Sequence, residues 1–274
     1  MRRAEKPLPL RHAVVLGLVQ GPAELLPVSS SAHTALIPWL AGWPYARLEG
    51  DQRKSFEVAL HSGGACALAL AGRGELLNQL RSLDRRRASV LALALAPPAI
   101  AGYALRETIA SRLGGPRSIA AGLLAGAVAM ALADARPGRA GHGSRRCEDA
   151  SPRDGLVLGL AQAIALIPGV SRNGATLTAA RARGFGRQDA HALSWSIALP
   201  VILGAGALEG RRLHSRGART HMPAMAAGAI AAFLSTLTSA RLLGRRGRDR
   251  PLLPYSLYRC LLAAIALRRL RRAQ

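Results

Sequence analysis

Five polar side chains stand in two short stretches of otherwise apolar sequence, and their types fit chemistry on a phosphate group: Gln20, Glu24, Ser30, His33 and Arg172. Ser30 and His33 are three residues apart, which brings a hydroxyl nucleophile within reach of an imidazole base if a helix begins near Ser30. Arg172 offers a planar fork of donors suited to phosphate oxygens. Ser30 could instead be a helix N-cap, and both roles are compatible because free amides at a helix start also bind anions.

Gln20 and Glu24 are four residues apart and therefore share one face of a helix. A carboxylate and an amide oxygen are ligands for a hard divalent cation, Mg²⁺ or Ca²⁺, which also bridges phosphate oxygens. Only one of the two side chains is charged, so a polar face that lines a water-filled entry is the alternative. An ion pair between Glu24 and Arg172 that serves structure alone also stays open.

The two stretches belong to an internal repeat. The sequence VLGLVQ at residues 15–20 leads to PVSSS at 27–31, and VLGLAQ at 157–162 leads to PGVSR at 168–172. The valines that begin the copies are 142 residues apart, and the prolines are 141 apart. Each copy reads as a short helix, a polar loop and a second short helix, which is the layout of a re-entrant hairpin. Inverted repeats with broken helices typically meet at a polar site near the bilayer midplane.

Long apolar runs with at most one charged residue each predict an all-α integral membrane protein. The chain has 274 residues and a net charge of +23, but its arginines gather between apolar runs, as in loops at anionic headgroups. No RNA-binding signature is visible, so nucleic acid is not an expected partner. We expect an inverted repeat of about six transmembrane helices, each near ~20 residues, plus two re-entrant helix-loop-helix hairpins. The apolar runs are Phe56–Ala71, Ala88–Leu105, Ser118–Ala133, Ala190–Leu208, Met222–Ala240 and Pro251–Leu267.

We expect these elements to form a single polytopic membrane domain over residues 1–274. Repeat one covers residues 10–133 and repeat two covers 154–268, with approximate limits. Between them, residues 134–153 are polar, charged and glycine-containing, which is typical of a linker.

Both motifs together resemble the undecaprenyl-pyrophosphate phosphatase family, integral membrane phosphatases of the bacitracin-resistance type. The family motif (E/Q)xxxE running into LPVSSxxH is similar to residues 20–33, and its PGxSRSGxT motif is similar to residues 168–176. The likeness extends to residues 56–70, to residues 194–200 and to Tyr258-Arg259, and so covers most of the chain.

The resemblance implies an enzyme that hydrolyses undecaprenyl (C55 polyprenyl) diphosphate to the monophosphate and inorganic phosphate. This reaction recycles the lipid carrier for peptidoglycan synthesis, cell-wall biogenesis and cell shape, in a multi-pass protein of the bacterial inner membrane whose site faces outward among membrane lipids. By position, Glu24 and Gln20 match the pair associated with metal or phosphate, Ser30 the nucleophile, His33 its acid/base partner and Arg172 the phosphate clamp. The supporting phosphate-binding residues are Ser29, Ser31, Ser171, Asn173, Gly174 and Thr176.

The sequence departs from the family pattern at several positions. Ser31-Ala32 replaces Thr-Gly and Asn173 replaces Ser, and both changes keep the side chains small. Gln20 stands where many members have Glu, which should weaken cation binding, and His61 stands where the family usually has Gln. His61 either adds a titratable group near the site or replaces one hydrogen-bonding side chain by another, and we favour the second interpretation. A polyprenyl-phosphate flippase or another inverted-repeat transporter is the alternative function, although a carrier has no use for Ser-x-x-His beside an arginine. A phosphoserine intermediate or direct attack by water, the identity of the metal and a homodimer all stay open.

Overall fold

The protein is helical throughout the part of the chain that the computed structural model describes, which comprises residues 8–48, 50–135, 144–213, 221–243 and 250–272. Within these ranges no strand forms, and the prediction of an all-α chain is confirmed. In chain order the helices are α1 (Leu10–Leu25), α2 (Ser30–Ala41), η1 (Pro44–Arg47), α3 (Gly50–Ala71), α4 (Arg73–Arg81), α5 (Arg85–Ala104), α6 (Arg106–Arg112), α7 (Pro116–Asp134), η2 (Cys147–Asp149), α8 (Pro152–Ile164), α9 (Arg172–Ala182), α10 (Arg187–Leu213), α11 (Met222–Leu243) and α12 (Leu253–Arg272).

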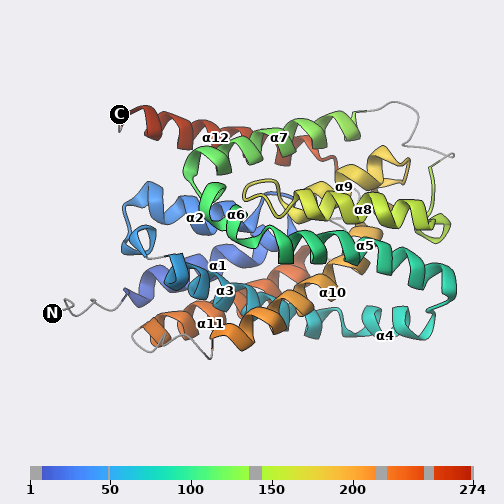
Figure 1. Ribbon diagram of the computed structural model, residues 1–274, viewed down its shortest axis with the longest axis horizontal. Helices are drawn as coiled ribbons and strands as arrows, with labels where there is room; N and C mark the ends of the chain where they lie inside the picture. The colour runs from blue at the N-terminus through green and yellow to red at the C-terminus, as the bar shows by residue number, and fades with distance from the viewer. Residues whose placement is uncertain (1–7, 49, 136–143, 214–220, 244–249, 273–274) are drawn as a thin grey trace. The chain divides into compact units, whose positions relative to one another are not determined.

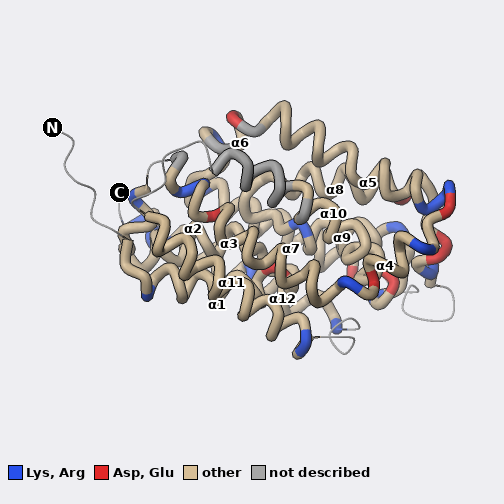
Figure 2. The backbone as a smooth tube through the Cα atoms, turned by 90° about the horizontal axis from the view of Figure 1, so that it is seen from below, with Lys and Arg blue, Asp and Glu red and all other residues tan. Residues whose placement is uncertain are grey.

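Among the described helices, α5, α7 and α11 are long and apolar enough to cross a membrane. Each covers all or nearly all of one of the uncharged runs found in the sequence, and the middle of α5 carries neither Lys nor Arg (Figure 2). The other three runs also form helices, α3, α10 and α12. Charged residues lower the hydropathy of two of these, because α3 contains Arg53 and Lys54 and α12 ends in arginines. A total of about six spanning helices stays a prediction.

Four helices flank the two serine loops and are short. They are α1 with 16 residues, α2 with 12, α8 with 13 and α9 with 11, against the ~20 that a spanning helix requires. The order of short helix, loop and short helix in each repeat is therefore as the sequence predicts. Two unpredicted helices, α4 and α6, lie outside the long apolar runs.

The chain divides into two compact units, and each draws on both halves of the sequence. The first unit comprises Met1–Leu25, His33–Arg73 and Leu199–Leu242. The second comprises Leu26–Ala32, Gly74–Ala198 and Leu243–Gln274. Both serine loops belong to the second unit.

In the first unit, glycines bring α1 into close contact with α11. A Cβ atom at Gly17 would overlap the carbonyl oxygen of Gly228, and one at Gly21 would overlap Ser235. The Ser235 hydroxyl donates a hydrogen bond to the carbonyl oxygen of Leu18 over 2.6 Å. Leu18 and Gly21 are close neighbours of Gln20 in α1, so these contacts with α11 fix the part of α1 that carries Gln20.

In the second unit, α5 lies beside α8 and α7 lies beside α12, while α9 contacts α7 and α8 (Figure 1). The backbones of α5 and α8 approach closely because a Cβ atom at Gly155 or Gly159 would overlap carbonyl oxygens of α5. The Gln162 amide nitrogen donates to the Ala94 carbonyl oxygen over 3.0 Å. These contacts fix the helix that leads into the second serine loop.

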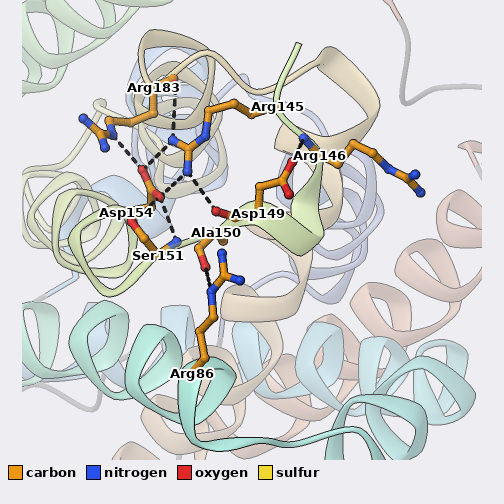
Figure 3. A network of polar contacts seen from close by, with 8 residues as sticks. All are labelled: Arg86, Arg145, Arg146, Asp149, Ala150, Ser151, Asp154 and Arg183. Atoms are coloured by element: carbon orange, nitrogen blue, oxygen red, sulfur yellow. Dashed lines mark hydrogen bonds and ion pairs between the residues drawn. The ribbon is translucent and has the colours of Figure 1, made fainter. Parts of the chain in front are cut away.

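A buried carboxylate fixes the N-terminus of α8 (Figure 3). Asp154 accepts hydrogen bonds from Arg145 Nη1 (3.0 Å) and Nη2 (2.7 Å), from Arg183 Nε (2.7 Å), and from the backbone nitrogen (2.8 Å) and hydroxyl (2.7 Å) of Ser151. Burial works to raise the pKa of Asp154, but the hydrogen bonds from Arg145, Ser151 and Arg183 outweigh it and hold the pKa well below 3.8. The sequence predicts only a polar linker here, of which residues 136–143 lie outside the described part of the chain.

Candidate active site

The two serine loops share an unusual backbone feature at one serine each. Ser29 (φ 75°) and Ser171 (φ 69°) are the non-glycine residues with positive φ in the described chain, and they are 142 positions apart, like the valines of the repeat. Each immediately precedes a helix, since α2 begins at Ser30 and α9 at Arg172. Left-handed backbone is unfavourable for serine, so strain of this kind is retained only where the surroundings fix it.

Both serines cap the helix that follows. The Ser29 hydroxyl oxygen accepts from the Ala32 backbone nitrogen over 3.4 Å, and the Ser171 hydroxyl oxygen accepts from the Gly174 nitrogen over 3.2 Å. The cap of α2 is therefore Ser29, and Ser30 occupies the first helical position, with His33 one turn further on. The start of a helix is an anion-binding site because its first amides have no partner in the helix and its dipole favours negative charge.

Hydroxyl and amide side chains fix the first turn of α9. The buried hydroxyls of Thr176 and Ser194 lie 2.6 Å apart, and the Ser194 hydroxyl donates to Asn173 Oδ1 over 3.1 Å. Thr176 also donates to the carbonyl oxygen of Arg172 over 3.0 Å. Sequence reasoning did not single out Ser194, although a hydroxyl inside the apolar run Ala190–Leu208 was a usable signal. These contacts orient the half-buried Arg172.

In the first unit, Gln20 and Glu24 share one face of α1, as their spacing predicts, and His61 of α3 joins them. The Gln20 amide nitrogen donates to Glu24 Oε2 over 3.2 Å and lies 3.0 Å from His61 Nδ1. His61 Nδ1 is also 3.6 Å from Glu24 Oε2, whose side chain is only 9% exposed. His61 Nδ1 accepts a hydrogen bond from the Gln20 amide nitrogen in this arrangement, because an amide nitrogen can only donate.

The oxygens of Gln20 and Glu24 fit a hard divalent cation only in part. Gln20 Oε1 is buried and has no hydrogen-bond partner, so one amide oxygen and one neighbouring carboxylate are the available ligands. In the described chain no group of three or more His, Cys, Asp or Glu side chains could hold a metal ion. Mg²⁺ commonly keeps several waters and binds through one or two carboxylates and substrate phosphates. The pair therefore fits a cation completed by a phosphate ligand rather than an all-protein site.

The residues expected from the sequence fall into two groups. Gln20 and Glu24 contact one another in the first unit, which also contains the buried His33. Both serine loops lie in the second unit, and in the first of them the hydroxyl oxygens of Ser29 and Ser31 are 3.3 Å apart. The full set in the second unit is Ser29, Ser30, Ser31, Ser171, Arg172, Asn173, Gly174 and Thr176.

Comparison with known proteins places this sequence in a family. The family model described as bacitracin resistance protein BacA matches residues 13–265, which contain both serine loops. An undecaprenyl-diphosphatase of Geobacter sulfurreducens is 36% identical over 275 residues, 94% of this chain and 97% of the relative. Those of Chromohalobacter salexigens (34% over 269 residues, 93% and 97% of the two chains) and Pelotomaculum thermopropionicum (41% over 202 residues, 71% and 73%) are also similar. The chain belongs to the bacitracin resistance protein BacA family.

Proposed function

We propose that this protein is an undecaprenyl-diphosphatase, which hydrolyses undecaprenyl diphosphate to undecaprenyl monophosphate and inorganic phosphate. The observation that carries the proposal is the family match over residues 13–265, together with relatives of this name that cover more than nine tenths of the chain. The product is the lipid carrier of cell-wall synthesis, which links the reaction to bacitracin resistance. The relatives give no support to a flippase.

In the proposed reaction the two helix starts bind the diphosphate. Backbone amides at the beginning of α2 and of α9 would donate hydrogen bonds to a negatively charged ligand. Arg172, at the first position of α9, adds two parallel donors for phosphate oxygens. The positive φ that Ser29 and Ser171 share supports this role, because each serine ends its loop and caps the helix that follows. The assignments of Ser31, Ser171, Asn173, Gly174 and Thr176 as supporting phosphate ligands stay proposals.

Ser30 and His33 would carry the chemistry. The Ser30 oxygen attacks the terminal phosphorus in line with the bridging oxygen, and His33 takes the hydroxyl proton. The bond from phosphorus to the bridging oxygen breaks, the lipid monophosphate leaves, and His33 gives the proton to it, which restores the neutral imidazole. Water then hydrolyses the phosphoserine, with His33 as base. The alternative to this phosphoserine route is direct attack of water on the phosphorus, in which Ser30 only binds the phosphate. Their positions on the first turn of α2 support the pair, since Ser29 already serves as the cap.

A divalent cation is a proposed cofactor, and Glu24 and Gln20 would hold it. Bound there, it would neutralise charge that develops on phosphate oxygens. The contribution of the chain itself is positional, because the Gln20 amide nitrogen binds the Glu24 carboxylate and so orients it.

We also propose the finer architecture: six membrane-spanning helices, two re-entrant hairpins and an inverted repeat in a single inner-membrane domain, with the site facing outward. Support comes from helix lengths, because α3, α10 and α12 have 22, 27 and 20 residues, as many as a span requires. The short helices α1, α2, α8 and α9 support the hairpins, since none is long enough to span.

The function is tested by phosphate release from a polyprenyl diphosphate by purified protein in detergent, with and without a chelator. We expect release by the parent protein and near-complete loss in Ser30→Ala. With a substrate labelled in its terminal phosphate, label on the parent protein and none on Ser30→Ala indicates the phosphoserine route. A parent protein that releases no phosphate but moves polyprenyl phosphate across vesicle bilayers would contradict the proposal in favour of the flippase.

A further inference from the structure

One buried arginine in the second unit contacts both serine loops. Arg259 is the single charged residue in the run Pro251–Leu267, and its side chain in α12 is 0% exposed. Its Nη2 donates to the carbonyl oxygens of Val170 (2.8 Å), Gly169 (3.0 Å) and Gly122 (3.4 Å), and its Nη1 donates to that of Pro27 (3.4 Å). Its partners thus come from the first loop, the second loop and α7.

No carboxylate neutralises this guanidinium in the described chain. All four hydrogen-bond acceptors of Arg259 are backbone carbonyl oxygens, and its Nε has no partner. A fully buried cation without a counter-ion is unfavourable, and a buried apolar residue at this position would avoid that cost. Helix α12 could pack without a charge, so the arginine needs a reason beyond packing.

Three of the four acceptors lie one or two residues before the two strained serines. Pro27 is two residues before Ser29, and Gly169 and Val170 are the two residues before Ser171. Holding the Val170 carbonyl group restrains the peptide plane that leads into Ser171, and holding the Pro27 carbonyl group restrains the plane one residue before the one that leads into Ser29. One side chain therefore contacts the backbone ahead of both helix starts.

Glycines make room for the guanidinium on two sides. A Cβ atom at Gly126 of α7 would overlap Arg259 Nη2, and one at Gly174 of α9 would press on Nη1. The Gly126→Ala substitution would therefore displace the guanidinium without removing its charge. Arg259→Lys keeps a positive charge but loses the planar guanidinium and its two donor nitrogens Nη1 and Nη2.

We propose that Arg259 is a positioning residue that holds both serine loops in register with one another, so that the amides and side chains at the starts of α2 and α9 meet one phosphate-bearing substrate. The link to substrate rests on the proposed function; the link between the loops does not. Both loops therefore depend on the Arg259 side chain, and a substitution that displaces its guanidinium changes the conformation of both loops at once.

The test compares Arg259→Lys and Gly126→Ala with the parent, with Arg268→Lys as the matched control because Arg268 is an exposed arginine of the same helix. In detergent, hydrogen exchange is followed in peptides that cover residues 26–32 and 168–174, with residues 88–100 of α5 as internal reference. Phosphate release from polyprenyl diphosphate gives kcat and KM. Misplacement of binding groups by about 1 Å can cost about 100-fold in rate.

We expect both substitutions to accelerate exchange in both loops while the α5 reference is unchanged, and kcat to fall by about 10- to 100-fold with a smaller change in KM. Arg268→Lys should match the parent. Parent-like exchange, acceleration in one loop alone, or equal acceleration in the α5 reference would each overturn the proposal. If Arg259→Lys does not fold, Gly126→Ala decides by the same readout. If the parent releases no phosphate, the proposed function fails while the exchange data still decide the role of Arg259.

Discussion

Replacing Asp154 by Asn should destabilise the second unit substantially. The carboxylate is 0% exposed and is held by two arginines and by Ser151 at the start of α8 (Figure 3). An amide at this position presents only one oxygen, turns its nitrogen toward donors, and leaves Arg145 and Arg183 without a counter-ion.

The size of the effect follows from the exposure of the partners. Removing one member of a buried ion pair costs about 3–5 kcal/mol. The side chains of Arg145 and Arg183 are 31% and 40% exposed, so water recovers part of their solvation once the carboxylate is gone. We therefore expect the free energy of unfolding to fall by about 2–3 kcal/mol. The exposed Arg146–Glu148 pair, 3.6 Å apart, is the control, and Glu148→Gln should change stability by less than about 0.5 kcal/mol.

Thermal unfolding in detergent at several pH values measures this effect. The pKa of Asp154 in the folded protein is below its ordinary value of 3.8, so its contribution is complete at neutral pH and is lost as pH falls below about 3.8 toward the folded pKa. The gap between parent and Asp154→Asn should accordingly be constant from pH 5 to pH 8 and narrow in acid. A variant as stable as the parent at pH 7 would refute the reasoning.

Three further predictions concern the candidate site. Arg172→Lys should lower kcat for phosphate release at least ~10-fold, about 1.4 kcal/mol of barrier, because an ammonium lacks the two-pronged contact; parent-level activity would make Arg172 structural. Gln20→Glu should tighten divalent-cation binding, so that activity saturates at lower metal concentration, and an unchanged metal titration would remove Gln20 from the cation site. Ser30→Ala and His33→Ala should each nearly abolish release, with the double variant scarcely worse than the worse single one; small additive losses would indicate a purely structural role.

Much of the fold could be predicted because it depends on local sequence. Each long apolar run forms a helix, since hydropathy and length act along one continuous segment. The shared face of Gln20 and Glu24 and the helix start at Ser30 were likewise predictable from spacing and capping. Helices α4 and α6 were not, because short amphipathic segments resemble polar loops.

The connections between distant segments could not be predicted. Arg259 was visible as a lone charge in an apolar run, but its acceptors lie 89 to 232 residues away in sequence. The buried Asp154 looked like one more charge at the edge of a polar linker, and Arg183, its second arginine, is 29 residues further on. Left-handed backbone at Ser29 and Ser171 is equally hidden, because serine rarely adopts it and glycine would be the usual signal.

The matched caps at Ser29 and Ser171 bear on how such a site can arise. A duplicated segment brings two copies of one anion-binding helix start, and the residue after each cap is then free to diverge while the backbone stays the same. In this chain that position is Ser30 in one copy and Arg172 in the other. Under the proposed mechanism, one copy has become the attacking group and the other the ligand of the phosphate it attacks.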